Sequence, residues 1–158
     1  QQNKNLIYKT KTKAVWKRII KLFLRLAISA SFLSAVADRF GLWSSEVSVW
    51  GNWDNFLAYT KLINPWFPDS LIPLLGISAT IAEIAFAFFL LIGFKTELFA
   101  KLSGLLLLIF ALSMTFSTGV KGAFDFSVFS ASAGAFALSL IKEKYLELDS
   151  LIFKSRNV

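Results

Sequence analysis

Four apolar stretches constrain this chain most, because each approaches the length needed to cross a lipid bilayer. They span residues 19–42, 70–94, 98–118 and 126–141, and the last is the shortest. A hydrocarbon core about 30 Å thick needs roughly 20 mostly apolar residues per helix. Hydrophobic residues make up 56% of the 158-residue chain and charged residues only 17%, so the composition is that of a membrane protein. We therefore predict an all-α integral membrane four-helix bundle.

The chain contains neither Cys nor His. Disulfides, thiolate chemistry and Fe–S clusters are thereby excluded, and the usual ligands of haem and zinc are missing. A Ser-His-Asp triad is excluded for the same reason. We expect no metal site, no intrinsic cofactor and no catalytic residue, although the sequence does not decide whether the protein belongs to an enzyme.

The basic residues lie mostly on one side of a four-span arrangement. Eight precede residue 26, two lie in the second loop, four lie in the C-terminal tail, and three fall on the other side. Because cytoplasmic loops carry the excess of Lys and Arg, we predict a multi-pass membrane protein with both termini cytoplasmic. A net charge of +7 beside apolar spans favours anionic lipid over nucleic acid as a partner. A cleaved signal peptide is an alternative explanation of the basic start, but no convincing cleavage site follows it.

Three regions are expected along the chain. Residues 1–18 form a basic cytoplasmic segment that shows no periodicity and is expected to become ordered only with a partner. Residues 19–141 form the transmembrane bundle. Residues 142–158 alternate charged and apolar side chains and are expected to prolong the fourth span as a cytoplasmic helical tail.

The long first loop, residues 43–69, is rich in aromatic side chains. Apolar and small residues recur at helical spacing within it, at Trp53, Phe56, Leu57, Thr60 and Ile63, and Pro65 and Pro68 follow. This pattern predicts a short interfacial helix on the extracytoplasmic side. Membrane anchoring is the preferred role of this helix, and a lid or docking surface is the alternative.

Glu83 lies near the middle of the second span, where a carboxylate costs roughly 3 kcal/mol on the insertion scale. It shares a helix face with Gly76 and Thr80, so we predict that this face points into the bundle. Its expected partner is Arg25, because both lie at comparable depths at 1.5 Å rise per residue. Alternatively, Arg25 reaches the inner headgroups and Glu83 is protonated.

Asp38 and Arg39 end the first span, at the entrance to the long loop. We expect them to form ion pairs with Asp69, Lys121 or Asp125, or to be solvated at the interface.

Small residues indicate where the helices approach each other closely. In the first span they recur at every fourth position, and in the fourth span the same spacing is seen beside a glycine. The predicted packing residues are Ala27, Ser31, Ala35, Gly76, Ser127, Ala131, Gly134 and Ala135. The third span lacks such a pattern and is expected to face lipid or a partner subunit.

The chain resembles the DoxX-like family of small four-span bacterial membrane proteins. The resemblance covers residues 25–141 and depends on Arg25 in the first span, on Glu83 in the second, and on the run Phe-Leu-Leu-Ile-Gly-Phe-Lys-Thr at residues 89–96. This family includes membrane subunits of thiosulfate:quinone oxidoreductase and of complexes linked to oxidative stress. The resemblance therefore implies a protein of the bacterial inner membrane with a quinone-linked or redox-partner role, and with a site at Glu83 and Arg25 that extends to Asp38 and Arg39. From the residues themselves, Thr80 is expected beside Glu83 in an apolar pocket that could hold a quinone head.

Three functions remain in view. The leading one is a non-catalytic accessory subunit that packs against a larger membrane complex and holds a lipid or a quinone. The second is the membrane subunit of a quinone-linked oxidoreductase that uses Glu83 and Arg25. The third is a small proton-linked transporter in which Glu83 takes up and releases the proton.

Overall fold

The computed structural model describes residues 2–150, and it describes the side chains of residues 11–150. The fold is all-helical, with 78% of the residues in helices and no strand in the described part of the chain. The helices are α1 (Gln2–Arg39), α2 (Trp53–Ile63), the 3-10 turn η1 (Asp69–Leu71), α3 (Ile72–Ile92), α4 (Thr96–Thr118), α5 (Val120–Asp125) and α6 (Val128–Leu140). Within this part, three helices are long and apolar enough to cross a membrane: α1 from Lys11 onward, α3 with its preceding turn, and α4.

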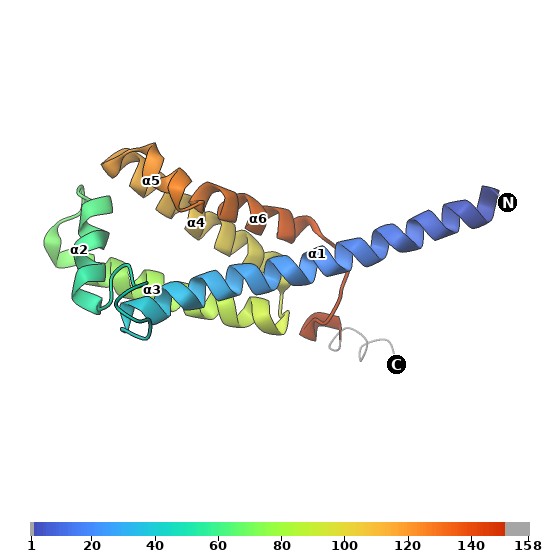
Figure 1. Cartoon of the computed structure of the whole chain (residues 1–158), viewed down its shortest axis with the longest axis horizontal. Coiled ribbons are helices and arrows are strands. Elements are labelled where there is room, and N and C mark those ends of the chain that lie inside the picture. The colour runs from blue at the N-terminus through green and yellow to red at the C-terminus, as the bar shows by residue number, and fades with distance from the viewer. Residues whose placement is uncertain (1, 151–158) are drawn as a thin grey trace.

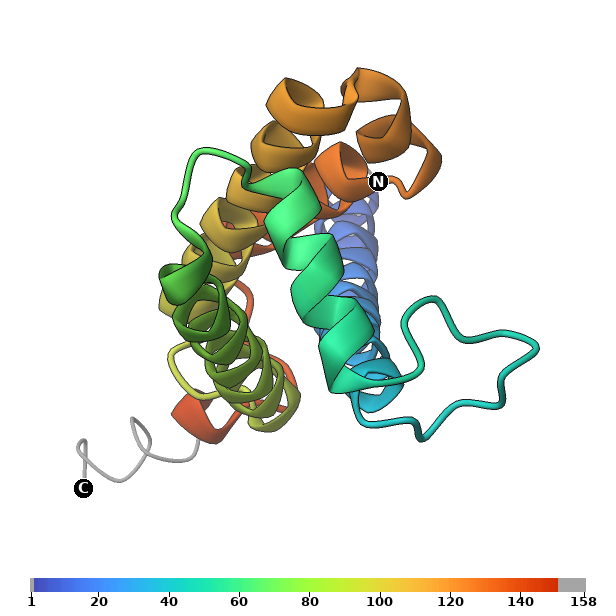
Figure 2. The same cartoon turned by 90° about the vertical axis from the view of Figure 1, so that its left-hand side faces the viewer.

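The long helices lie side by side, and α2 lies across one end of them (Figures 1 and 2). We call this end, with α2 and residues 40–52, the loop end. The opposite end, with the turn at Gly93 and residues 141–150, is the tail end. The beginning of α1 and the last described residues lie on the tail-end side of the bundle (Figure 1). The chain returns to this side because α6 runs back along α4.

The fourth apolar stretch differs from its prediction, because the helix is interrupted. Asp125 ends α5, and Ser127 adopts a left-handed conformation with φ 55°. The remaining helix α6 has 13 residues, or a length of about 20 Å. It is apolar but shorter than a full span. Of the predicted four-helix membrane bundle, the structure shows an all-helical fold with three long apolar helices.

Two terminal segments also differ from expectation. The basic segment 1–18 was expected to need a partner for order, but the helix α1 already begins at Gln2. Its many straight-chain residues favour helix, and residues 2–39 contain no Gly or Pro that would break it. The predicted helical tail is wrong for residues 141–147, which are not helical, while residues 148–150 are helical. Residues 151–158 lie outside the described part.

The helix packing uses other residues of α1 than predicted. Ser31 is exposed and hydrogen-bonds within its own helix, to the carbonyl oxygen of Ala27. Ala27 and Ala35 are only half-buried. The buried face of α1 instead contains larger residues and a different serine, namely Ile28, Ser29, Phe32 and Val36. Ser29 is the small residue at which α1 approaches α3, because its hydroxyl donates to the carbonyl oxygen of Ala87 at 3.1 Å.

Close approach does occur between α4 and α6. The Ser132 hydroxyl donates to the carbonyl oxygen of Gly104 at 2.8 Å, and a Cβ on Gly104 would lie 3.0 Å from the Phe136 ring. The third span therefore packs against α6 on one face, while Leu105, Ile109 and Phe116 on α4 are exposed. Of the residues predicted in the fourth span, Ala135 is buried, Ala131 and Gly134 are half-buried, and Ser127 is exposed at the helix interruption.

The predicted helix in the first loop is confirmed as α2. Its first turn is capped by Asn52, whose side chain accepts a hydrogen bond from the Asn55 amide at 2.8 Å. Gly76 of α3 lets α2 pack closely, since a Cβ at Gly76 would lie 2.7 Å from Leu57 Cδ2. The role predicted for Gly76 in packing is thus explained by α2, which covers α3 at the loop end.

Candidate functional site

A buried ion pair lies at the loop end. Arg39 donates from Nη2 to Glu83 Oε1 at 2.9 Å and from Nη1 to Glu83 Oε2. Nη1 also donates to the Thr80 hydroxyl at 2.7 Å. The arginine and the glutamate are only 3% and 2% exposed, so the pair is isolated from solvent by its own chain.

The expected pairing of Glu83 with Arg25 is therefore wrong. Arg25 lies fourteen residues before Arg39 in α1, or about 21 Å along the helix. It lies level with the C-terminal end of α3, whereas Arg39 reaches the middle of α3. The prediction was based on the depths of Arg25 and Glu83 along their helices. It did not allow for the length of the Arg39 side chain, which reaches Glu83 from the end of α1.

Aromatic rings cover the ion pair. Arg39 Cζ lies 4.0 Å from the centroid of the Phe56 ring in α2 and 5.4 Å from that of Trp50 in the loop. Both distances are within the range of cation–π attraction. Two N–H donors, Arg39 Nε and the Trp50 indole Nε1, are buried and have no hydrogen-bond partner among the described residues.

Asp38 holds the loop that carries Trp50. Its carboxylate accepts hydrogen bonds from the Ser48 hydroxyl, from the Val49 amide at 3.0 Å and from the Trp50 amide at 2.9 Å. The ion pairs expected for Asp38 and Arg39 are wrong. The partners proposed for them pair with other residues: Asp69 with Lys61, and Lys121 with Asp125.

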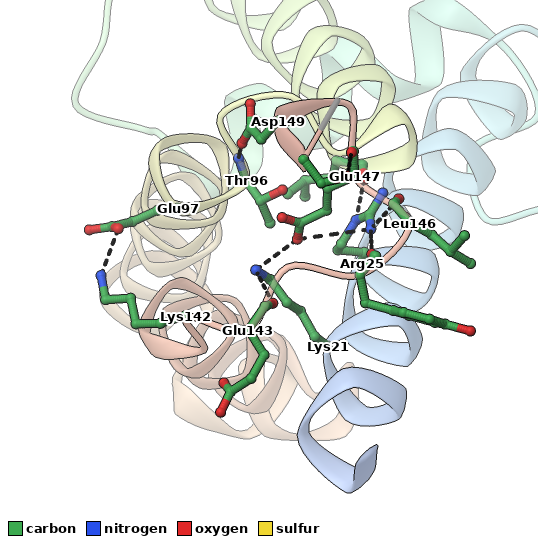
Figure 3. Close-up of polar contacts among 12 residues, drawn as sticks. Lys21, Arg25, Thr96, Glu97, Lys142, Glu143, Leu146, Glu147 and Asp149 are labelled. Atoms are coloured by element: carbon green, nitrogen blue, oxygen red, sulfur yellow. Dashed lines mark hydrogen bonds and ion pairs between the residues drawn. The ribbon is translucent and has the colours of Figure 1, made fainter. Parts of the chain in front are cut away.

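Arg25 forms a second polar centre at the tail end (Figure 3). Its Nε and Nη2 donate to the carbonyl oxygens of Leu90 and Leu91, both at 2.8 Å. Its Nη1 donates to the carbonyl oxygens of Tyr145 at 3.0 Å and Leu146 at 2.9 Å. The last carbonyls of a helix have no partner within it, and a cation there interacts favourably with the helix dipole. Arg25 therefore closes α3 and attaches residues 145–146 to it.

Lys21 and Glu147 strengthen this attachment (Figure 3). Lys21 Nζ lies 2.7 Å from Glu147 Oε1 and donates to the Glu143 carbonyl oxygen at 2.8 Å. Glu147 packs directly on Gly93, where a Cβ would lie 2.6 Å from the Glu147 Cα. Gly93 has φ 68°, so a side chain there would be strained as well as crowded.

Asp149 completes the tail-end centre. Its carboxylate accepts from the backbone amides of Lys95 at 3.0 Å and Thr96 at 3.4 Å, at the beginning of α4 (Figure 3). The Asp149 amide donates to the Gly93 carbonyl oxygen at 3.2 Å. Sequence reasoning missed Lys21, Glu147 and Asp149 as members of a site. The alternating charges after residue 141 were the available signal, but they suggested an amphipathic helix.

Glu143 lies at the exposed edge of this centre. Its side chain pairs with Lys17 at 2.8 Å. The hydrogen bond from Lys17 is the main reason why the pKa of the Glu143 carboxyl lies below its usual value.

The two centres differ in what they can bind. Every nitrogen of the Arg25 guanidinium donates to a backbone carbonyl of the chain, so this guanidinium has a structural role. At the same end the Thr96 hydroxyl is buried without a hydrogen-bond partner among the described residues. At the loop end, the two unpartnered donors beside aromatic rings match an acceptor oxygen on a flat or apolar molecule. Across residues 2–150 there is no group of three or more acidic residues placed to hold a metal ion.

Comparison with protein-family models, with curated proteins and with solved structures finds no match to this chain.

Proposed function

We propose that this chain is a DoxX-like integral membrane protein of the bacterial inner membrane, which crosses the bilayer four times with both termini in the cytoplasm. The support is the three long apolar helices, whose outward faces carry large exposed apolar side chains such as Phe23, Ile81 and Phe116. The return of the chain to the tail end through α5 and α6 supports an even number of crossings. In this orientation α2 is the interfacial helix on the extracytoplasmic side.

Its function in this proposal is that of an accessory subunit in a larger membrane complex. The observation that carries this is the first part of α1, residues 2–16, which continues as a helix of about 22 Å beyond the rest of the fold. No other element lies beside this arm in Figure 1. It is basic in sequence, and a rigid basic helix that projects from a membrane protein fits an acidic surface of a partner subunit.

Deletion of residues 2–14 tests the accessory role. In native membranes solubilised with mild detergent, the full chain should elute within a stoichiometric assembly much larger than 17.7 kDa. The shortened chain should elute alone with an unchanged midpoint of thermal unfolding, because the arm lies outside the bundle. A full chain that elutes as an isolated bundle contradicts the accessory role.

A quinone site at the loop end is the second candidate, and the unpartnered donors Arg39 Nε and Trp50 Nε1 favour it. A quinone carbonyl accepts hydrogen bonds, and the rings of Trp50 and Phe56 suit a flat ring. Gly41 and Gly51, with φ 69° and 71°, flank the segment that carries Trp50 and allow its backbone conformation. The transporter alternative gains no comparable support, since Glu83 is hydrogen-bonded by Arg39 through both oxygens.

Trp50→Phe tests the quinone site, because it keeps an aromatic ring and removes the N–H donor. A short-chain ubiquinone or menaquinone analogue should raise the unfolding midpoint of the purified protein in detergent, and Trp50→Phe should reduce that shift. Trp66→Phe, at an exposed tryptophan of the same loop, is the matched control. Equal shifts in wild type and Trp50→Phe would remove quinone binding at this place.

A further inference from the structure

A shallow apolar groove runs between α4 and α6 near the tail end. Its volume is ≈ 460 Å³, and it is lined by Lys101, Leu102, Leu105, Phe136, Ser139 and Leu140. The groove exists because α6 ends at Leu140 and the chain then turns toward Arg25, which leaves the beginning of α4 uncovered on this side. Leu105 and Leu140 are exposed here.

Lysines gather at the tail end of this groove. Lys101 and Lys142 both bind the Glu97 carboxylate, each at 2.7 Å, so two cations share one carboxylate. Lys101 also lines an adjoining hollow of ≈ 380 Å³ together with Lys95. The Asp149 carboxylate beside it accepts from two backbone amides. Three lysines, Lys95, Lys101 and Lys142, thus lie around two carboxylates, Glu97 and Asp149, so positive charge exceeds negative charge by one at this rim.

We propose that the groove is a binding site for an anionic phospholipid of the inner leaflet. One acyl chain lies on Leu102, Leu105 and Leu140, and the phosphate is bound by Lys101 and Lys142. An ammonium group has three donors, so each lysine can bind a phosphate oxygen and keep its contact with Glu97. Basic pockets between helices on the cytoplasmic side are suited to anionic headgroups. The proposal rests on the membrane insertion proposed above, but not on the accessory role or on the quinone site.

The order of groups along the helix axis supports a lipid over a free anion. The cations lie at the end of the groove, at the level of the turn between α3 and α4, and the apolar lining continues from them toward the middle of the bundle. A molecule with an anionic head and an apolar chain satisfies both parts. Inorganic phosphate would satisfy only the rim.

Native mass spectrometry of the delipidated full chain in detergent tests the site. The probes are phosphatidylglycerol and phosphatidylcholine with identical acyl chains, and inorganic phosphate. The wild type should bind one phosphatidylglycerol at least tenfold more tightly than phosphatidylcholine, and Lys101→Gln with Lys142→Gln should remove this difference, since each lysine near a headgroup contributes about 1 kcal/mol. Leu105→Trp should weaken both lipids by filling the groove. Lys121→Gln is the control, because Lys121 forms an exposed pair with Asp125 at the loop end.

Three results would overturn the proposal. These are equal affinity of the wild type for the two lipids, unchanged phosphatidylglycerol affinity in the double lysine variant, and an equal loss in Lys121→Gln. Competition by millimolar inorganic phosphate without a preference for phosphatidylglycerol would identify an anion site instead. A chain that stays monodisperse without detergent and binds neither lipid would contradict membrane insertion itself. Because Lys101, Lys142 and Glu97 are exposed, the double variant should keep its unfolding midpoint.

Discussion

The two ends of the bundle each bury an arginine of α1, but the buried charge is stabilised by different groups at the two ends. At the loop end Arg39 is paired with the side chain of Glu83, and two N–H donors are left without partners. At the tail end Arg25 donates to four backbone carbonyls, two of them at the C-terminal end of α3. A buried cation can thus be stabilised by a counter-charge or by helix-end carbonyls. At the loop end the unpartnered atoms are N–H donors beside the ion pair, whereas at the tail end the Thr96 hydroxyl oxygen is buried without a hydrogen-bond partner in the described part of the chain.

The largest expected effect is at the loop end. Glu83→Ala should lower the free energy of unfolding by about 3–5 kcal/mol, because it leaves the Arg39 guanidinium buried without its counter-charge. Thermal unfolding in detergent measures the loss. The double variant Arg39→Met with Glu83→Leu should recover most of it, since neither charge is then buried. A double variant as unstable as Glu83→Ala would show that the site depends on more than charge balance.

A smaller loss is expected at the tail end. Arg25→Met should cost about 2–3 kcal/mol, because it deprives buried carbonyls of their donors, although water at this end can replace part of the bonding. The loss of attachment should also expose residues 141–150 to limited proteolysis. Arg18→Met, at an exposed position of the same helix, is the control and should change neither property. Resistance to protease in Arg25→Met would contradict the role of Arg25 in attaching the tail.

The smallest effect is expected at the pair of Lys17, which is exposed, and Glu143, which is half-buried. Because the pKa of Glu143 is lowered in the folded protein, its contribution to stability is present above the unfolded pKa of about 4.3 and is lost as the pH falls below that value. The unfolding midpoint of Lys17→Gln should therefore lie slightly below that of wild type at pH 7 and approach it near pH 3. Lys13→Gln, also exposed in α1, should show no such convergence. A gap of constant size across this range would exclude a role for Glu143 ionisation.

Hydrophobic length and periodicity predicted much of the fold. The long apolar helices and α2 follow from the span lengths and from the spacing of Trp53, Phe56, Thr60 and Ile63. The buried face of α3 with Glu83 and Thr80 was predicted for the same reason, since a polar residue in an apolar helix must face the interior. These features could be predicted because each depends on the residue pattern within a single helix.

The partners of the polar residues could not be predicted in this way. Arg25 and Arg39 are both in the first span. Only the three-dimensional path of the tail shows that Arg25 donates hydrogen bonds to the carbonyl oxygens of residues 145 and 146. Small residues were also misleading in α1, because Ser31 satisfies its hydroxyl within its own helix. The interruption at Ser127 lacks the Gly or Pro that usually marks one.

The attachment of residues 145–146 to Arg25 has a consequence for biosynthesis. About 120 residues separate the guanidinium from the Tyr145 carbonyl, so α1 is complete long before its last acceptors are translated. Until then only Nη1 waits for its acceptors and must be solvated, because Nε and Nη2 can already donate to Leu90 and Leu91. Emergence of residues 145–146 from the ribosome is therefore the step that allows the tail end to close, and a chain terminated before residue 145 would leave it open.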